Sequence, residues 1–325
     1  MRVNTLGGKR QLNKCHSGVV KPLFLCNDVI MKNLHIQHPE DSILSGDLSV
    51  LDWFLTPSHL SVKIDGSPAV VWGTNPATGN FFVGTKSVFN KVKIKINESH
   101  EDIDNNHEDA VAEILHACFD YLPHTDDVIQ GDFIGFGGDD TYTPNTLTYI
   151  FDEIVTEEII IAPHTFYHCE KDLRDAVAYP MEYFNMQGNA YVKMVQPKCW
   201  ESEEDFEEIV GFARQMAQLV TFAEPLEAEK LKIELNKCIR EGVDVVPDTF
   251  DNSMLISFWF LIKSIKDDML FMCRNNGAKT YINGKQCEGE GYVRSNEYGM
   301  FKLVNRYEFS RANFNNMKGW GGRSA

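Results

Sequence analysis

The hydrophobic periodicity of this sequence changes along the chain, and that change limits the possible folds more than any other feature. Between residues 61 and 104, and again after a helical segment at 107–122, apolar residues occur in short runs bounded by turn residues, which is typical of β-strands. Between residues 202 and 272 they recur at three- and four-residue spacing, which is typical of amphipathic helices. Residues 288–304 return to the strand pattern. The sequence therefore predicts an α+β fold in which a helical insertion interrupts a core of antiparallel sheets.

Individual elements follow from the same patterns. Strands are expected at 61–64, 69–72, 81–83, 91–96, 128–134, 147–151, 159–162 and 191–195. Helices are expected at 49–55, at 107–122 with Asn106 as N-cap, from Ser202 to about 220, at a segment ending at Gly242, and at 253–272. The chain then divides into a leader (1–34), the first part of the core (35–200), the helical insertion (201–275), and a segment that completes the core and ends in a basic tail (276–325).

Charge and cysteine usage limit the classes of function. The chain has 31 basic and 47 acidic residues, a formal charge of −16, which argues against non-specific coating of duplex DNA but allows a local cationic groove. The eight cysteines form no C-x-x-C pair, as expected for free thiols in a reducing compartment. The strongest apolar run, 254–262, is too short to span a bilayer, and the N-terminus lacks the apolar stretch of a signal peptide. We therefore expect a cytoplasmic protein that does not enter membranes, and we expect it to be a monomer.

The sharpest local motif is Lys63-Ile64-Asp65-Gly66-Ser67, in which a lysine ends an apolar strand just before a tight turn. A partly desolvated amine at such a position can act as a nucleophile. Alone, the motif also fits a surface lysine beside an ordinary Asp-Gly turn. Further features follow in order: Lys86 after the next hairpin, Asp132 within an apolar strand, the aromatic strand Tyr149-Ile150-Phe151, and Glu290-Gly291-Tyr292-Val293 followed by Lys302.

The order, type and approximate spacing of these motifs resemble the covalent nucleotidyltransferase superfamily, which includes ATP-dependent DNA ligases, RNA ligases and mRNA capping guanylyltransferases. The resemblance covers roughly residues 55–310, and the Lys-x-Asp-Gly-Ser form is most similar to bacteriophage RNA ligases. It implies an ATP-grasp-like core of two packed antiparallel sheets with the nucleotide between them. It also implies ATP and Mg²⁺ as cofactors, and the host cytoplasm as the location if the protein is phage-encoded.

The resemblance also assigns roles to individual residues. Lys63 would become covalently nucleotidylated, with Lys302 and Glu290 completing the catalytic set, and Asp132 and Glu290 would hold the metal. The nucleotide would be bound by Val62, Lys63, Ile64, Asp65, Gly66, Lys86, Asp132, Tyr149, Phe151 and Lys302, the aromatic strand stacking on the base. The polynucleotide would be contacted by Lys86, Lys91, Lys93, Lys95, Arg306 and Arg311. Fixed cations are needed because phosphoryl transfer spreads negative charge over the phosphate oxygens.

Two of these nucleic-acid contacts allow more than one interpretation. In the expected strand 91–96 the three lysines would share one face, which suits a surface that follows a polynucleotide backbone but equally suits the solvated face of an edge strand. The last motif holds only Lys302 where the family usually has two lysines, and Arg306 is a candidate for the second phosphate contact.

The last motif also has a rival placement, and a second type of metal site can be drawn. Gln187–Lys193 could replace Glu290 and Lys302 as the Glu-Gly-x-Val-x-Lys motif, although it lacks the acid and is one residue too long. His164, His168 and Cys169 could be drawn as a zinc site, although they lack a second matched pair. About 20 residues follow the last motif, too few for an OB-fold, so no C-terminal OB-fold is expected.

The implied activity is ATP-dependent joining of a 5′-phosphate end to a 3′-hydroxyl end through lysyl-AMP and AMP–polynucleotide intermediates. RNA is favoured over DNA as the substrate. Two different functions would also fit the sequence. One is a capping-type guanylyltransferase, which would attach GMP; the second is a non-catalytic nucleic-acid-binding protein with the same fold.

Overall fold

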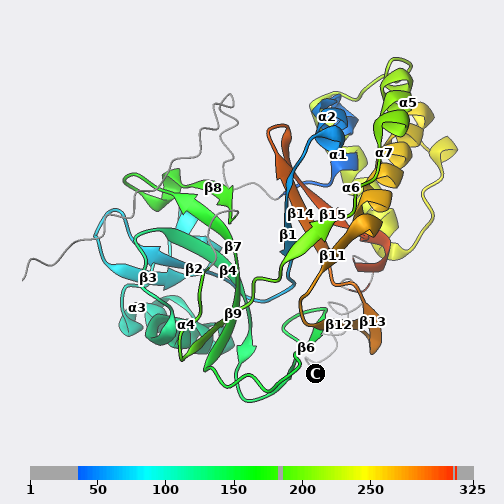
Figure 1. Ribbon diagram of the computed structural model, residues 1–325. Helices are drawn as coiled ribbons and strands as arrows, with labels where there is room; N and C mark the ends of the chain where they lie inside the picture. The colour runs from blue at the N-terminus through cyan, green and yellow to red at the C-terminus, as the bar shows by residue number, and fades with distance from the viewer. Residues whose placement is uncertain (1–35, 182–185, 310–311, 313–325) are drawn as a thin grey trace, which may run out of the picture.

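The computed structural model describes residues 36–181, 186–309 and 312. A large sheet with two helices lies on one side of a small three-stranded sheet, and a layer of helices lies on the other side (Figure 1). The predicted leader and nearly all of the predicted basic tail, including Arg311, lie outside the described residues.

The largest sheet has six strands, and all its neighbouring strands are antiparallel except β7 and β9. Its order is β3-β2-β4-β7-β8, with β9 also pairing to β7. The strands are β2 (Ala69–Thr74), β3 (Phe81–Gly84), β4 (Val128–Phe136), β7 (Ile159–His168), β8 (Val177–Pro180) and β9 (Val192–Met194). Helices α3 (His100–Asn106) and α4 (Asp109–Tyr121) cover one face, where Leu115 and Cys118 pack against Trp72 and Ile129. Because strand residues alternate, Gln130 and Asp132 of β4 lie on the opposite face.

The small central sheet carries most of the predicted motifs. Its antiparallel order is β1-β14-β15, formed by β1 (His59–Lys63), β14 (Gly291–Asn296) and β15 (Gly299–Val304). Val62, Tyr292 and Leu303 are cross-strand neighbours on one face, which packs against the helical layer. The alternation places Lys63 and Lys302 on the other face, which is turned toward the large sheet.

The helical layer buries the apolar face of the central sheet. It consists of α1 (Pro39–Ser42), α2 (Ser49–Leu55), α5 (Glu207–Ala217), α6 (Pro225–Glu241) and α7 (Ser253–Met272). Helix α7 is its centre, because Phe258, Trp259 and Ile262 are fully buried there. The helices near residues 39–55, which the sequence places in the first part of the core, thus pack with the insertion.

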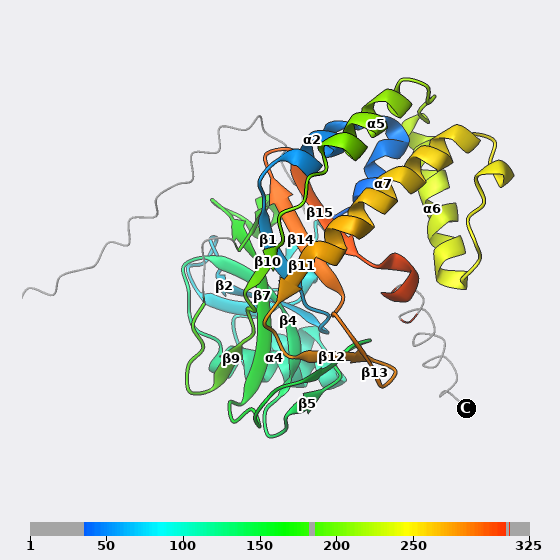
Figure 2. The ribbon, with the colours of Figure 1, turned by 45° about the vertical axis from the view of Figure 1, so that its right-hand side comes forward.

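A two-stranded ribbon joins the helical layer to the rest of the molecule. β10 (Cys199–Glu201) leads into the layer, β11 (Cys273–Asn275) leads out of it, and the two strands pair in antiparallel fashion (Figure 2). A four-stranded sheet of order β13-β12-β6-β5 completes the fold. Its strands are β5 (Thr141–Tyr142), β6 (Thr148–Ile150), β12 (Lys279–Ile282) and β13 (Lys285–Cys287). Short 3₁₀ helices are η1 (Ile43–Ser45), η2 (Lys86–Phe89), η3 (Leu173–Asp175) and η4 (Pro247–Thr249).

These elements confirm the predicted mixed α+β class with antiparallel sheets. Helices 49–55 and 253–272 have the predicted ends, and α6 ends at Gly242, whose φ of +69° is the left-handed conformation of a helix cap. The helix predicted over 107–122 begins later, at Asp109, because Asn106 ends the preceding helix α3. Likewise α5 begins at Glu207 rather than just after Ser202. None of the helices in the described ranges is long and apolar enough to cross a membrane.

The strand predicted over 91–96 is wrong. Residues 91–93 form bends and 94–96 have no regular structure. Lys93 has a φ of +57°, and the bridge to β3 is made by Asn97 with Val83. Lys91 and Lys93 are exposed, whereas the Lys95 ammonium donates to the carbonyl of Asn106. The three lysines therefore do not share one strand face.

Candidate active site at the end of strand β1

The centre of the candidate site is an ion pair between Lys63 and Glu290. Lys63 is the last residue of β1 and faces Gly291 in the register of β1 with β14, so that Glu290 reaches it from the neighbouring strand end. The Lys63 side chain is 25% exposed and that of Glu290 only 9%. Burial raises the pKa of Glu290, and the nearby Lys63 charge opposes this rise. The pair thus joins a solvent-accessible amine to a largely desolvated carboxylate.

Lys302 brings a second amine to the same place. It lies on β15 opposite Val293 and points from the same sheet face as Lys63. The pKa of Lys302 is lowered to about 8, mostly by burial and also by the positive charges of Lys63 and Lys86, while the Glu290 carboxylate opposes the shift. Lys86, at the start of η2, is therefore near enough to act on the cluster electrostatically. Lys63 and Lys302 both act on the Glu290 carboxylate and Lys86 acts on Lys302, so amines gather here in an arrangement suited to an anion.

The turn after Lys63 is held by Asp65, which is buried. Its carboxylate accepts hydrogen bonds from Asn145 Nδ2 (2.8 Å) and from the backbone N–H groups of Thr146 (2.8 Å) and Leu147 (3.1 Å). Its own N–H donates to the hydroxyl oxygen of Tyr149 at 2.7 Å. Asp65 therefore positions the strand end that carries Lys63, and Tyr149 supports the turn from β6. Burial raises the pKa of Tyr149, so its hydroxyl stays protonated.

Two glycines allow the close backbone contacts that the site needs. A Cβ at Gly66 would lie 2.7 Å from both the Cβ of Asp132 and the carbonyl oxygen of Phe133, so only glycine lets this turn pack on β4. Gly291 has a φ of +139°, and a Cβ there would lie 2.0 Å from the carbonyl oxygen of Leu303. Gly291 thus lets β14 approach β15 closely where Glu290 and Lys302 meet.

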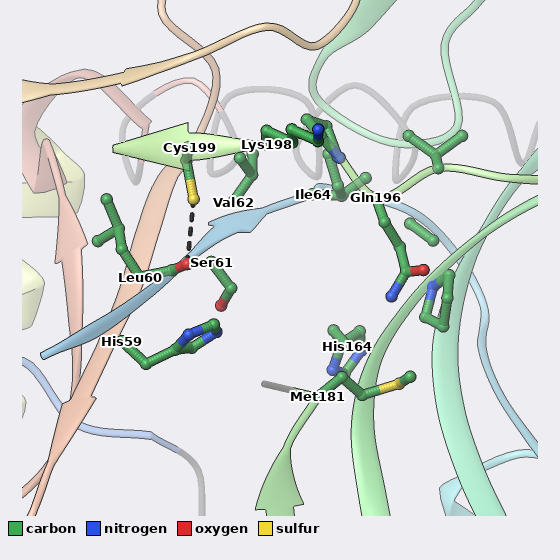
Figure 3. Close-up of a pocket in the computed structure, with 14 residues that line it drawn as sticks. His59, Leu60, Ser61, Val62, Ile64, His164, Met181, Gln196, Lys198 and Cys199 are labelled. Atoms are coloured by element: carbon green, nitrogen blue, oxygen red, sulfur yellow. Dashed lines mark hydrogen bonds between the residues drawn. The ribbon is translucent and has the colours of Figure 1, made fainter. Parts of the chain in front are cut away.

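A cavity of about 380 Å³ adjoins this cluster, between β1 and the large sheet. Figure 3 shows His59 and Ser61 of β1 on one side, His164 and Met181 on the other, and Gln196 above them. The lining includes Val62 and Ile64, which flank Lys63, but not Lys63, Glu290 or Lys302. The amine cluster therefore lies beside the cavity rather than inside it, and the cavity has the size of a small-ligand site.

Polar groups of the large sheet face the same region. His164 Nε2 lies 3.7 Å from Asp132 Oδ1 and 3.3 Å from Gln130 Nε2. His164 Nδ1 lies 2.7 Å from the hydroxyl oxygen of Thr165. The sequence singled out Asp132 here, and the structure adds Gln130 and His164 to its surroundings.

Several predicted site residues lie elsewhere. Phe151 packs edge-on against Tyr142 and lies under the ammonium of Lys193. Lys193 belongs to β9 on the large sheet, so the geometry favours Glu290 and Lys302 over the rival placement at Gln187–Lys193. Tyr149 is buried, and its hydroxyl is engaged with Asp65. Base stacking by this aromatic strand remains a prediction.

The assignment of Arg306 to nucleic acid is wrong. Its side chain is 1% exposed and its guanidinium donates to Glu40 (2.9 Å), Asp41 (2.8 Å) and Asn236 (2.7 Å). It therefore anchors the chain after β15 to α1 and α6. It can supply neither the missing phosphate contact of the last motif nor a contact to a polynucleotide.

The assignment of Asp132 and Glu290 as metal ligands remains a prediction. Among the residues that the structure describes, no three His, Cys, Asp or Glu side chains are grouped to hold a metal ion, which also applies to the zinc site drawn at His164, His168 and Cys169. Asp132 is partly exposed and Glu290 is engaged with Lys63. This donor set fits Mg²⁺, which proteins often bind through one or two carboxylates together with substrate phosphates.

The sequence patterns did not indicate which residues form the walls of the cavity. Alternation along β1 could have placed His59 and Ser61 on the face of Lys63, because the three are two residues apart. His164, Met181 and Gln196 come from β7, from the end of β8 and from the segment before β10, and no local pattern marks their approach to β1.

Fold and site together define a mixed α+β protein with a lysine–carboxylate cluster beside a cavity between two sheets. The chain belongs to a family of unknown function, DUF6267, whose profile matches residues 33–250 and 224–318. Comparisons with curated proteins and with solved structures give no match.

Proposed function

We propose that this protein is a covalent nucleotidyltransferase with an ATP-grasp-like core, acting as an ATP-dependent polynucleotide ligase that favours RNA. The observation that carries the proposal is the meeting of Lys63, Glu290 and Lys302 at one strand end, although Lys63 and Glu290 are 227 positions apart. These are the three residues to which the motif order assigns the chemistry. The cavity beside them offers space for the rest of a nucleotide.

The first step would be attack by the Lys63 amine, after loss of its proton, on the α-phosphorus of ATP. A P–N bond forms to AMP and the P–O bond to pyrophosphate breaks. Glu290, whose carboxylate contacts the Lys63 ammonium, is placed to orient the amine. Lys302 and Lys86 would neutralise phosphate charge. Mg²⁺ bound with ATP, held by Asp132 and Glu290, would shield the triphosphate.

The later steps would move AMP to a 5′-phosphate and then release it. The 5′-phosphate oxygen of the polynucleotide attacks the lysyl-AMP phosphorus, which breaks the P–N bond. A 3′-hydroxyl then attacks the activated 5′-phosphate, which forms the phosphodiester and expels AMP. The partners are therefore RNA or DNA ends that carry a 5′-phosphate and a 3′-hydroxyl.

The test is intact-protein mass spectrometry after incubation with Mg²⁺ and either ATP or GTP. We expect the wild type to gain one AMP from ATP, and Lys63→Arg to gain nothing, because a guanidinium stays protonated and cannot attack. Lys230→Arg, an exposed lysine of α6, is the matched control and should be labelled like the wild type. Labelling from GTP alone would instead support a capping-type guanylyltransferase.

Two outcomes would contradict the proposal outright. One is an adduct that persists in Lys63→Arg. The other is the absence of any adduct from both nucleotides, which would favour a non-catalytic nucleic-acid-binding protein. If the adduct forms, sealing of 5′-phosphorylated single-stranded RNA against the same sequence in DNA distinguishes the two substrates, and RNA is expected to react faster.

A further inference from the structure

The ribbon formed by β10 and β11 has two different faces. Its inward side chains are anchored: Cys199 Sγ lies 3.1 Å from the carbonyl oxygen of Leu60, Glu201 pairs with Arg294, and Asn275 donates to the hydroxyl of Tyr292. Cys273 is buried. Because strand residues alternate, Trp200 and its cross-strand partner Arg274 point outward. The inward side chains fix the ribbon against the central sheet, and on the outward face the Arg274 guanidinium donates to the carbonyl oxygens of Phe271 (2.6 Å) and Cys273 (2.7 Å).

The outward face combines exposed aromatic rings with cations. Trp200 is 51% exposed, and Phe271, at the end of α7, is 73% exposed. The Arg274 guanidinium lies 5.5 Å from the Phe271 ring centre, so it links the two aromatic residues. Lys198, two residues before Trp200, is also exposed. The acid of the ribbon, Glu201, points the other way, so the outward positions of these two strands carry no carboxylate.

Lys198 lies at the border between this face and the cavity beside Lys63. Lys198 and Cys199 line that cavity, and Cys199 contacts β1 through Leu60 (Figure 3). A chain molecule lying along the outward face would therefore pass Lys198 at the edge of the cavity. In a protein of formal charge −16, a cationic, aromatic strip at this place matches a polyanion with flat bases.

We propose that the outward face of the β10–β11 ribbon, formed by Lys198, Trp200, Phe271 and Arg274, binds single-stranded nucleic acid leading to the cavity. Unpaired bases stack on Trp200 and Phe271, and Arg274 and Lys198 contact the phosphates. A duplex buries its bases and offers no such stacking. The inference deepens the proposed function, because it states where the polynucleotide substrate lies.

The experiment is a titration of the full chain with fluorescein-labelled single-stranded RNA of about 16 nucleotides, without ATP, followed by anisotropy. Trp200→Ala should weaken binding about tenfold, whereas Trp200→Phe keeps a stacking ring and should retain most of the affinity. Arg274→Gln should lower the slope of log affinity against log salt by about 0.7, as expected for the loss of one phosphate contact on a single strand.

The controls are an aromatic residue and an arginine that are exposed like Trp200 and Arg274. Phe212→Ala on α5 and Arg240→Gln on α6 remove an exposed ring and an exposed cation of the helical layer, and both should bind like the wild type. Thermal unfolding of each variant shows whether it is folded. Equal binding by Trp200→Ala, Arg274→Gln and the wild type would overturn the inference, as would equal losses in the two controls.

Failure of this inference can be separated from failure of the proposed function, because RNA binding is measured without ATP and nucleotidylation is measured without RNA. A wild type that gains AMP but binds RNA independently of Trp200 overturns only the ribbon surface. A wild type that binds through Trp200 but gains no nucleotide overturns only the catalytic proposal. A wild type that binds no RNA also overturns the ribbon surface, and would point to a protein partner there instead.

Discussion

Two clusters of paired basic and acidic side chains lie near β15. They differ in solvent exposure and in the ratio of basic to acidic groups. In the first, Lys63 and Lys302 lie beside the carboxylate of Glu290, on which Asp65 also acts, and the Lys63 amine is partly exposed. In the second, Arg306 and Lys266 meet Glu40 and Asp41, and the side chains are almost wholly buried. The same residue types therefore anchor the fold in one place and form the proposed catalytic cluster in the other.

The electrostatics of the buried cluster explain its role. Burial alone would raise the pKa of Glu40, but Lys266 and Arg306 outweigh burial and lower it to about 2. Lys266 Nζ also donates to the carbonyl oxygen of Val304 at 2.8 Å. The cluster thus joins α1 and α7 to the end of β15. The open cluster sets the amines of Lys63, Lys302 and Lys86 against the carboxylates of Glu290 and Asp65, which leaves an excess of positive charge that suits an anion.

The largest expected effect is the loss of Arg306. Arg306→Met would leave Glu40 and Asp41 buried without their main partner, and we expect the free energy of unfolding to fall by about 3–5 kcal/mol. Denaturant unfolding measures this change. The exposed Arg240→Met should change the value by less than about 0.5 kcal/mol. A similarly small effect for Arg306→Met would show that the buried cluster is not an anchor.

The next largest effect is the change of the free energy of unfolding with pH that Lys302 causes. Its pKa is about 8 in the folded chain against 10.5 for the unperturbed side chain, so the unfolded chain binds the extra proton between these values. Stability must then rise with pH in this window, by an upper limit of about 3 kcal/mol. We expect the stability difference between wild type and Lys302→Met to follow this rise in urea unfolding. A flat difference from pH 8 to 10.5 would contradict the burial of Lys302.

A smaller effect is expected at the turn that positions Lys63. Asp65→Asn keeps the shape but replaces one acceptor oxygen by an NH₂ group, which then faces either the Nδ2 donor of Asn145 or the N–H donors of Thr146 and Leu147. We expect a loss of about 1–3 kcal/mol in denaturant unfolding. Asp139→Asn, at an exposed turn, is the control. Unchanged stability in Asp65→Asn would mean that the turn does not depend on this carboxylate.

The smallest effect on stability is expected at the open cluster itself. Lys63→Met removes a partly exposed ion-pair partner, and Glu290 can accept a proton because burial already raises its pKa. The free energy of unfolding, measured with denaturant, should change by about 1 kcal/mol or less. The AMP adduct should nevertheless disappear. A stability loss as large as that of Arg306→Met would remove the distinction between the two clusters.

Local signals made much of the fold predictable. Helices α2 and α7 have the predicted ends because their apolar spacing and stop signals are contained within the segments. The prediction of a strand at 91–96 was wrong because alternating apolar residues show only that a segment could pair with a neighbouring strand. In the structure Asn97 makes the bridge to Val83 instead. Whether a partner strand is available depends on tertiary structure.

Within the candidate site, only the residues that belong to the ordered motifs could be predicted from the sequence. Lys63, Glu290 and Lys302 were found through the order of their motifs, and the β1–β14–β15 register supplies the physical reason for their meeting. Arg306 was misassigned because a basic residue after a strand resembles a surface residue in sequence. Its partners Glu40 and Asp41 lie 266 and 265 positions away, too far for any local pattern to indicate the pairing.

The ribbon of β10 and β11 has a further consequence for how this chain can vary. The paired strands β10 and β11 flank the helical segment in the sequence. The 71 residues from Ser202 to Met272 are therefore an insertion whose two ends lie side by side. Loops between those helices can lengthen or shorten without shifting β1 against β14. Related chains can therefore remodel their helical surface while the lysine at the strand end keeps its place.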